Sequence, residues 1–146
     1  MNSKGNEQEL ADALEFARGQ RLAVLSTAST DGVAEAALMG IAVTEAFELI
    51  FDTLKTTRKY PNLKANPRVA LVIGCSGAVS LQYEGIAEEL AGETLDRYLE
   101  VYFRAFPDGR ERQHWPGMTY FAVHPKWLRY CDYRQPPPRI REFTWD

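Results

Sequence analysis

Short apolar segments separated by turn residues are the feature that most constrains the fold of this chain. In the clearest of them, Val79, Leu81 and Tyr83 alternate with polar residues, and this period of two is typical of a strand with one polar face. Asp31-Gly32 is a strong hairpin signal between two other segments. The pattern predicts strands over 21–27, 33–44, 47–52, 68–74, 78–90, 118–123 and 127–130. Six or seven strands with hairpin turns and few helices predict a mainly β protein, an antiparallel barrel with flanking helices.

Three segments predict helices, over 7–18, 57–65 and 92–106. The last carries an apolar stripe at helical spacing, which we interpret as core or as a dimer interface. Its members are Leu95, Tyr98, Leu99, Tyr102, Phe103 and Phe106. No repeat or linker divides the chain, so we expect one domain over 1–146, with an N-terminal helix within 1–19 and a Pro-rich tail over 135–146.

Composition excludes several classes of function. The net charge is -3 and the pI is near 5.5, whereas a nucleic-acid binder normally carries a basic excess. The sequence contains no apolar run of membrane-spanning length, and the polar N-terminus lacks the apolar core of a signal peptide. We therefore expect a cytoplasmic protein whose two cysteines, Cys75 and Cys131, are reduced and buried.

One junction between a strand and a short helix gathers hydroxyls and cations. Its residues are Thr56, Thr57, Arg58 and Lys59. A helix N-terminus offers unpaired N–H groups and a partial positive charge. With hydroxyl and guanidinium donors added, the junction predicts a cradle for the phosphate of a phosphate ester. The alternatives are a solvated charged turn and threonines that only cap the helix. At the other end of the helix we interpret Asn66 as a C-terminal cap.

Four segments in order resemble the pyridoxamine 5′-phosphate oxidase-like superfamily of FMN-binding split barrels. Residues 22–27 with Asp31-Gly32 are similar to the family's first hairpin. Residues 50–53 leading to Arg58-Lys59 are similar to its phosphate loop, in which a serine usually precedes Arg-Lys. Residues 63–71 are similar to its Asn-Pro element and the following strand, and Glu84-Gly85-Ile86-Ala87 to the next strand. The resemblance covers about 20–90 and implies a split barrel.

The resemblance also implies a homodimer with FMN bound between the subunits. Residue by residue, it assigns the FMN phosphate to Arg58 and Lys59, with Thr57 in the place of the serine. Thr53 would lie near the isoalloxazine, and the backbone of Leu38, Met39 and Gly40 would face the ring.

The chain departs from the family's pattern in three places, one of which is the absence of the oxidase's C-terminal Trp and Arg/His pattern, which binds the pyridoxal substrate. Residues 35–40 contain no cation where the oxidase has a phosphate-binding arginine on the second strand. Ser80 stands at the usual glutamine position, and Gln82 is displaced by two residues on the same face. We therefore expect an FMN-binding flavoprotein related to the oxidase, a flavin-dependent oxidoreductase, and not the oxidase itself. The alternatives are a member of the superfamily that binds F420 or haem, and a non-catalytic flavin-binding regulator.

Further candidates lie on loops and in the tail. Trp115, Phe143 and Trp145 have flat aromatic surfaces that suit stacking on a flavin. His114 lies in a loop that could border the cleft, and His124 is interpreted as structural. We expect no metal site, because the two histidines lack further ligands at suitable spacing. The substrate and any acid or base are not predicted.

Overall fold

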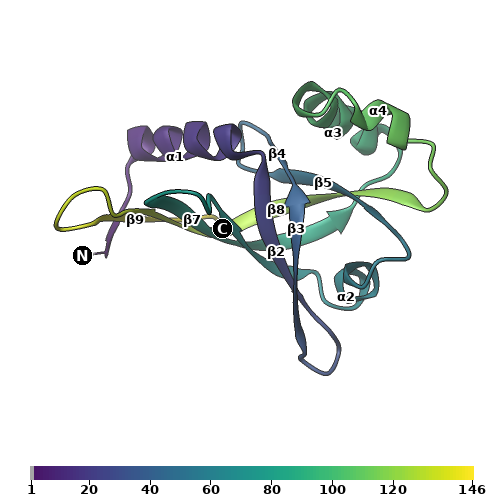
Figure 1. Ribbon diagram of the computed structural model, residues 1–146, viewed down its shortest axis with the longest axis horizontal. Helices are drawn as coiled ribbons and strands as arrows, with labels where there is room; N and C mark the ends of the chain where they lie inside the picture. Colours follow the sequence, from purple (N-terminus) through teal and green to yellow (C-terminus); the bar gives the residue numbers. More distant parts are fainter. Residues whose placement is uncertain (1) are drawn as a thin grey trace.

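Nine strands form one mixed sheet in the computed structural model, which describes residues 2–146 (Figure 1). The strands are β1 (Asn2–Lys4), β2 (Leu22–Ala28), β3 (Ala34–Gly40), β4 (Ala42–Val43), β5 (Leu49–Leu54), β6 (Arg68–Ile73), β7 (Val79–Glu89), β8 (Met118–Asp132) and β9 (Arg139–Thr144). The helices are α1 (Glu7–Gln20), α2 (Lys59–Ala65), α3 (Gly92–Ala105) and α4 (Gly109–Arg112). The main path runs β1-β9-β8-β7-β6-β2-β3, and β5 pairs with β4 and β8. Within 2–146, β3 pairs only with β2, so the barrel stays open.

The predicted mainly β architecture with flanking helices is confirmed, and the strand count is larger than expected. Every predicted strand and helix is present, with ends shifted by a few residues. The segments 118–123 and 127–130 are one strand, β8, in which Lys126 is an extra residue opposite the step from Glu84 to Gly85. The predicted strand 33–44 divides at Ile41 into β3 and β4.

Two unpredicted strands come from the ends of the chain. β9 lies in the Pro-rich tail and pairs antiparallel with β8, while β1 pairs parallel with β9, the one parallel pair in the described sheet. Both segments are short and lack a clear apolar alternation. They are strands because a neighbouring edge offers hydrogen-bonding groups, which local sequence does not reveal.

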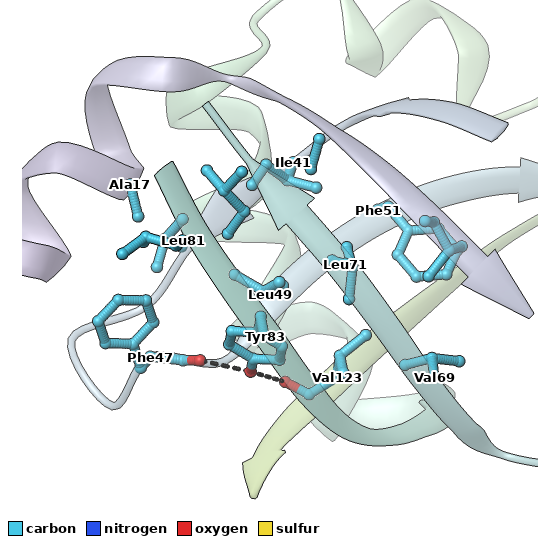
Figure 2. Packing of buried hydrophobic residues seen from close by; sticks show 14 of the residues in the cluster. Ala17, Ile41, Phe47, Leu49, Phe51, Val69, Leu71, Leu81, Tyr83 and Val123 are labelled. Carbon is cyan, nitrogen blue, oxygen red and sulfur yellow. Dashed lines mark hydrogen bonds between the residues drawn. The ribbon is translucent and has the colours of Figure 1, made fainter. Parts of the chain in front are cut away.

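The main core fills the inside of the curved sheet and is closed by α1. Figure 2 shows Leu49, Leu71 and Leu81 packing beside Tyr83 in this cluster. The Tyr83 hydroxyl lies 2.7 Å from the Phe47 carbonyl oxygen and 3.1 Å from that of Val123, so one buried group joins two segments. Burial raises the pKa of Tyr83, which keeps the phenol a donor.

A second core cluster lies between α3 and the strands β4, β5 and β8. The stripe predicted on 92–106 faces it: Leu99, Tyr102 and Phe103 are buried, and the remaining stripe residues pack against the cluster. The interpretation of the stripe as core is confirmed.

The N-terminal helix is held to the C-terminal strand by charge. Asn6 and Glu9 form a capping box at the start of α1, with Glu9 N to Asn6 Oδ1 at 2.8 Å. The Glu9 carboxylate also accepts hydrogen bonds from Arg139 and Arg141 of β9, both at 2.6 Å. Hydrogen bonding from Arg139, the largest cause, holds the pKa of Glu9 at about 2.

The outer face of the sheet is exposed and partly apolar. Leu38, Val24, Val72 and Gln82 are aligned across β3, β2, β6 and β7. Leu38 is 63% exposed and Val72 43% exposed, although β6 reads as an almost wholly apolar strand. We call this row, together with Leu22, the outer apolar face.

The prediction that both cysteines are buried is confirmed for one of them and wrong for the other. Cys131 is buried, but Cys75 lies exposed in the turn between β6 and β7. Both are free thiols.

Candidate functional site

The predicted phosphate cradle lines a groove between the open edge of the sheet and the loop before α2. The groove has a volume of about 380 Å³. Its walls are Leu25 and Thr27 of β2, Glu35, Ala36 and Ala37 of β3, and Thr56, Thr57, Arg58 and Lys59 of the loop and α2. We call it the α2 groove. The structure thus brings Thr57, Arg58 and Lys59 to one surface.

A chain of hydrogen bonds orients Lys59 and the two threonines. Lys59 Nζ donates to Thr53 Oγ1 at 3.3 Å, and the Thr53 and Thr57 hydroxyls are 2.9 Å apart. Thr57 Oγ1 donates to the Leu54 carbonyl oxygen at 2.8 Å. Because the Thr57 proton is used there, Thr53 donates to Thr57 and accepts from Lys59. Thr53 is buried, so it supports the cation from below.

Lys59 retains donors for a ligand. Among residues 2–146 it forms no ion pair within 4 Å, and the hydrogen bond to Thr53 uses one of its three N–H groups. Burial lowers its pKa, and the more distant Asp52 carboxylate opposes that shift. A partly desolvated ammonium without a carboxylate partner favours an incoming anion.

Arg58 is differently placed, because a carboxylate in the groove already binds it. Arg58 Nη2 lies 2.9 Å from Glu35 Oε2, and Asn62 Nδ2 donates to Glu35 Oε1 at 2.9 Å. Asn62 is buried and also donates to Thr27 Oγ1 at 3.1 Å. The Arg58 contact, the largest cause, lowers the pKa of Glu35, so the carboxylate is ionised at neutral pH. The groove therefore holds two cations and one anion.

Sequence reasoning missed Glu35 and Asn62 as residues of the site. The sequence shows no cation over 35–40, but it does not reveal that a carboxylate lies opposite Arg58. A polar Asn62 on the face of α2 that carries Leu63 was the available signal, since a buried amide needs polar partners.

A second carboxylate holds the far side of α2. Glu89 accepts hydrogen bonds from Lys64 Nζ at 2.9 Å, Thr119 Oγ1 at 2.6 Å and Tyr60 Oη at 3.1 Å. Burial by itself would raise the pKa of Glu89, but these donors outweigh it and lower the pKa. Glu35 and Glu89 thus fasten α2 to the sheet from two sides.

The start of α2 differs from the prediction. The helix begins at Lys59 rather than residue 57, and Arg58 is its N-cap residue without a side-chain cap. Thr57 bonds back to Leu54, so its interpretation as a helix cap is wrong. Asn66 is the C-cap residue as predicted, and its N–H donates to the Asn62 carbonyl at 2.7 Å.

Leu38, Met39 and Gly40 lie on β3, the edge strand beside the groove. Leu38 points outward, Met39 is buried, and a Cβ at Gly40 would stand 3.1 Å from the Phe106 ring. Gly40 is therefore a point of close approach, where a side chain would meet the Phe106 ring.

Ser80, Gln82 and Trp115 do not line the α2 groove of a single chain. Ser80 and Gln82 lie on β7, separated from β2 by β6, and Gln82 faces outward beside Val72. Trp115 is 51% exposed in the loop before β8, which reaches the β5–α2 loop through Lys55 N to Gly117 O at 2.9 Å.

The remaining aromatic and histidine candidates have structural surroundings. Phe143 is buried, and Trp145 packs edge-on to Phe47 with ring centroids 6.2 Å apart. His124 lies 3.1 Å from carboxylate oxygens of both Glu48 and Glu88. His114 is exposed.

Residues 2–146 contain no group of three or more His, Cys, Asp or Glu side chains arranged to hold a metal ion. In the same range, no helix has the length and apolar character to cross a membrane.

Comparison with known proteins decides the family. The family model for pyridoxamine 5′-phosphate oxidase matches residues 9–132. The chain belongs to this family. The match spans β2 to β8 and includes every residue that lines the α2 groove, so the groove lies in the part of the chain that the family shares. None of the curated proteins matches the chain in sequence.

Solved structures show that the family's fold is retained at low sequence identity. A heme binding protein from Mycobacterium smegmatis matches with a TM-score of 0.79 and 16% identity, over 91% of this chain and 56% of that one. A pyridoxamine 5′-phosphate oxidase-related, FMN binding protein from Nostoc punctiforme PCC 73102 matches with a TM-score of 0.65 and 12% identity, over 96% of each chain. General Stress Protein 26 from Bacillus anthracis matches with a TM-score of 0.68 and 21% identity, over 92% of this chain and 99% of that one. The split-barrel fold is therefore common to a heme binding protein and an FMN binding protein.

Proposed function

We propose that the chain binds FMN in the α2 groove and acts as a flavin-dependent oxidoreductase. The observation that carries the proposal is Lys59, a partly desolvated cation that is oriented by Thr53 and has no carboxylate partner among the described residues. Thr57 and Arg58 lie beside it in the groove. A phosphate dianion suits this set, because each charged hydrogen bond is shorter and stronger than a neutral one.

The chain's own residues would bind and orient the cofactor. Lys59 and Arg58 would hold the phosphate, and the Thr57 hydroxyl would donate to it after turning away from the Leu54 carbonyl. Thr53 would fix the position of the Lys59 ammonium. The edge strand β3 has main-chain groups without a strand partner, and those near Leu38, Met39 and Gly40 would face the flavin ring. Bound FMN would supply the redox chemistry, and the protein supplies placement and exclusion of water.

We also propose a homodimer that buries the outer apolar face. The face exposes Leu22, Leu38 and Val72, each more than two-fifths accessible in one chain. Ser80 and Gln82 of the same face lie away from their own chain's groove, so they would reach FMN from the partner subunit. Trp115 would close the cleft from its exposed loop.

The experiment is a titration of FMN and riboflavin into the purified protein, followed by flavin fluorescence. FMN should bind with micromolar affinity or better, and Lys59→Ala should weaken it at least tenfold, as expected for one lost charged hydrogen bond. Riboflavin lacks the phosphate, so Lys59→Ala should change its binding affinity little. Lys55→Ala is the matched control, since Lys55 lies four residues away over the Tyr60 ring and does not line the groove. A protein that ignores FMN overturns the proposal.

Haem and F420 are the other cofactors to test, and the structural match to a heme binding protein favours haem as the second candidate. The absorption spectrum of the purified protein separates them, because flavin, deazaflavin and haem absorb at different wavelengths. A Soret band in place of a flavin spectrum would transfer the assignment to haem.

Turnover is tested separately from binding. NAD(P)H oxidation by the FMN-loaded protein would support an oxidoreductase, and its absence would favour a non-catalytic flavin-binding protein.

Two free thiols, one of them exposed, suit a reducing compartment, and we propose the cytoplasm.

A further inference from the structure

A second cavity lies between the C-terminal ends of α1 and α3, separate from the α2 groove. Both helices pack on β4, which lies between them (Figure 1). The cavity has a volume of about 480 Å³, within the range of small-molecule sites. Its lining residues are Arg18, Arg21, Ile41, Ala42, Val43, Glu45, Val101, Arg104 and Ala105. No residue is shared with the α2 groove.

The floor of this cavity is apolar. Ile41, Ala42 and Val43 are buried, and Val101 and Ala105 of α3 form a partly buried wall. Such a floor gains free energy when an apolar ligand covers it.

Three guanidinium groups surround the floor, two from the C-terminal end of α1 and one from α3. Arg18 Nε donates to the Val43 carbonyl oxygen at 3.2 Å, and Arg21 Nη2 donates to that of Ala105. Arg21 also lies over the Phe106 ring, 4.8 Å from its centroid. These contacts orient two of the groups and leave most of their N–H donors free, because each guanidinium has five.

The positive charge of this cavity is uncompensated by ion pairs. Six of the twelve arginines pair with a carboxylate, and Arg18, Arg21 and Arg104 are among the six within residues 2–146 that do not. Glu45 is the one carboxylate in the lining, and it is exposed. The chain as a whole has a net charge of -3, so this is a local reversal of its charge.

The preference for cations at helix C-termini explains part of this arrangement, but it does not explain why three guanidinium groups lie around one cavity. Arg18 and Arg104 lie in the last turns of α1 and α3, where a cation offsets the partial negative charge of the helix end. Any cation near the C-terminus of a helix would have this effect. It does not require three guanidinium groups around one apolar floor.

We propose that this cavity binds a small organic anion, with its apolar body on β4 and its oxyanion between Arg21 and Arg104. Carboxylate, phosphate and sulfonate groups share this chemistry, because the guanidinium fork donates two parallel hydrogen bonds to each. Glu45 at the rim disfavours ligands with a second anionic group on that side.

The test uses the fluorescent sulfonate 8-anilinonaphthalene-1-sulfonate and its neutral counterpart N-phenyl-1-naphthylamine. The sulfonate should bind, octanoate should compete with it, and Arg104→Glu should weaken its binding about tenfold or more. Glu45→Gln should strengthen it severalfold. Arg97→Glu is the matched control, because it makes the same charge change two turns earlier on α3. Lys59→Ala should leave the sulfonate affinity unchanged, which separates this cavity from the α2 groove.

Amide chemical shifts locate the probe in the same titration. Changes should centre on Ile41, Ala42 and Val43 and saturate with the fluorescence signal. Equal effects of Arg104→Glu and Arg97→Glu, shift changes confined to the outer apolar face, or no binding of either anion at about 1 mM would each overturn the proposal.

Discussion

Glu35 Oε2 and Arg58 Nη2 lie 2.9 Å apart at the α2 groove, so a carboxylate of the protein already occupies one side of the proposed phosphate position. The side chain of Arg58 is 81% exposed, while Asn62 holds Glu35 from behind. An incoming phosphate must therefore share Arg58 with Glu35 or displace it. A single substitution at Glu35 would therefore change the net charge of the groove.

Replacing Glu35 with Gln should strengthen FMN binding roughly five- to tenfold, because it removes like-charge repulsion and releases Arg58. The amide can still accept the hydrogen bond from Asn62. The affinity for riboflavin should rise little, and the rise in FMN affinity should be smaller at high salt because salt screens the charges. Fluorescence titrations of both flavins at two salt concentrations measure this. An equal gain for riboflavin would show that repulsion of the phosphate is not the cause.

Glu9 should make stability depend on pH in the acid range. Its pKa is about 2 in the folded protein and 4.5 in the unfolded reference, so its contribution is fully present above pH 4.5. The contribution is lost as pH falls from there through about 2. Glu9→Gln should lower the free energy of unfolding by about 1–2 kcal/mol at pH 7 and by almost nothing at pH 2.

Urea unfolding at the two pH values tests this, with Glu7→Gln as the charge-matched control in the same helical turn. Gln at position 9 also preserves the capping box, so the loss reports the contacts to Arg139 and Arg141. A cost that is the same at both pH values would contradict the assignment.

Tyr83→Phe should destabilise the fold by about 1–3 kcal/mol, because it removes the buried donor that serves Phe47 and Val123. The expected fall in melting temperature is about 2–4 °C per kcal/mol. Differential scanning calorimetry measures the change. Tyr133→Phe, at an exposed phenol, is the control and should have no comparable effect.

Val72→Glu should convert the proposed dimer to a monomer, because a carboxylate would be placed in the middle of the outer apolar face. The fold should survive, since Val72 is 43% exposed in one chain. FMN affinity should fall with the dimer if Ser80 and Gln82 act from the partner subunit. Sedimentation velocity measures the assembly, and Val33→Glu, at a valine 56% exposed in the hairpin, is the control. A variant that remains a dimer would place the interface elsewhere.

Local pattern predicted most elements of this fold. The alternation over 79–89 and the apolar stripe on 92–105 each match an element, because both patterns report which side of a segment is buried. The hairpin at Asp31-Gly32 is also present, with Gly32 at a φ of 81°. β9 could not be predicted, because a tail with three consecutive prolines becomes a strand only when β8 offers its edge.

The sequence by itself determined that the chain is mainly β and that Thr57, Arg58 and Lys59 form one cationic turn, since both depend on residues close together in the chain. Tertiary structure decided what faces that turn. Glu35 lies 23 positions before Arg58 in the sequence and 2.9 Å from it in space, because pairing of β3 with β2 and packing of α2 bring them together. The convergence of Arg18, Arg21 and Arg104 likewise follows from two helices packing on β4. Charge acts through distance in space, and only the fold sets those distances.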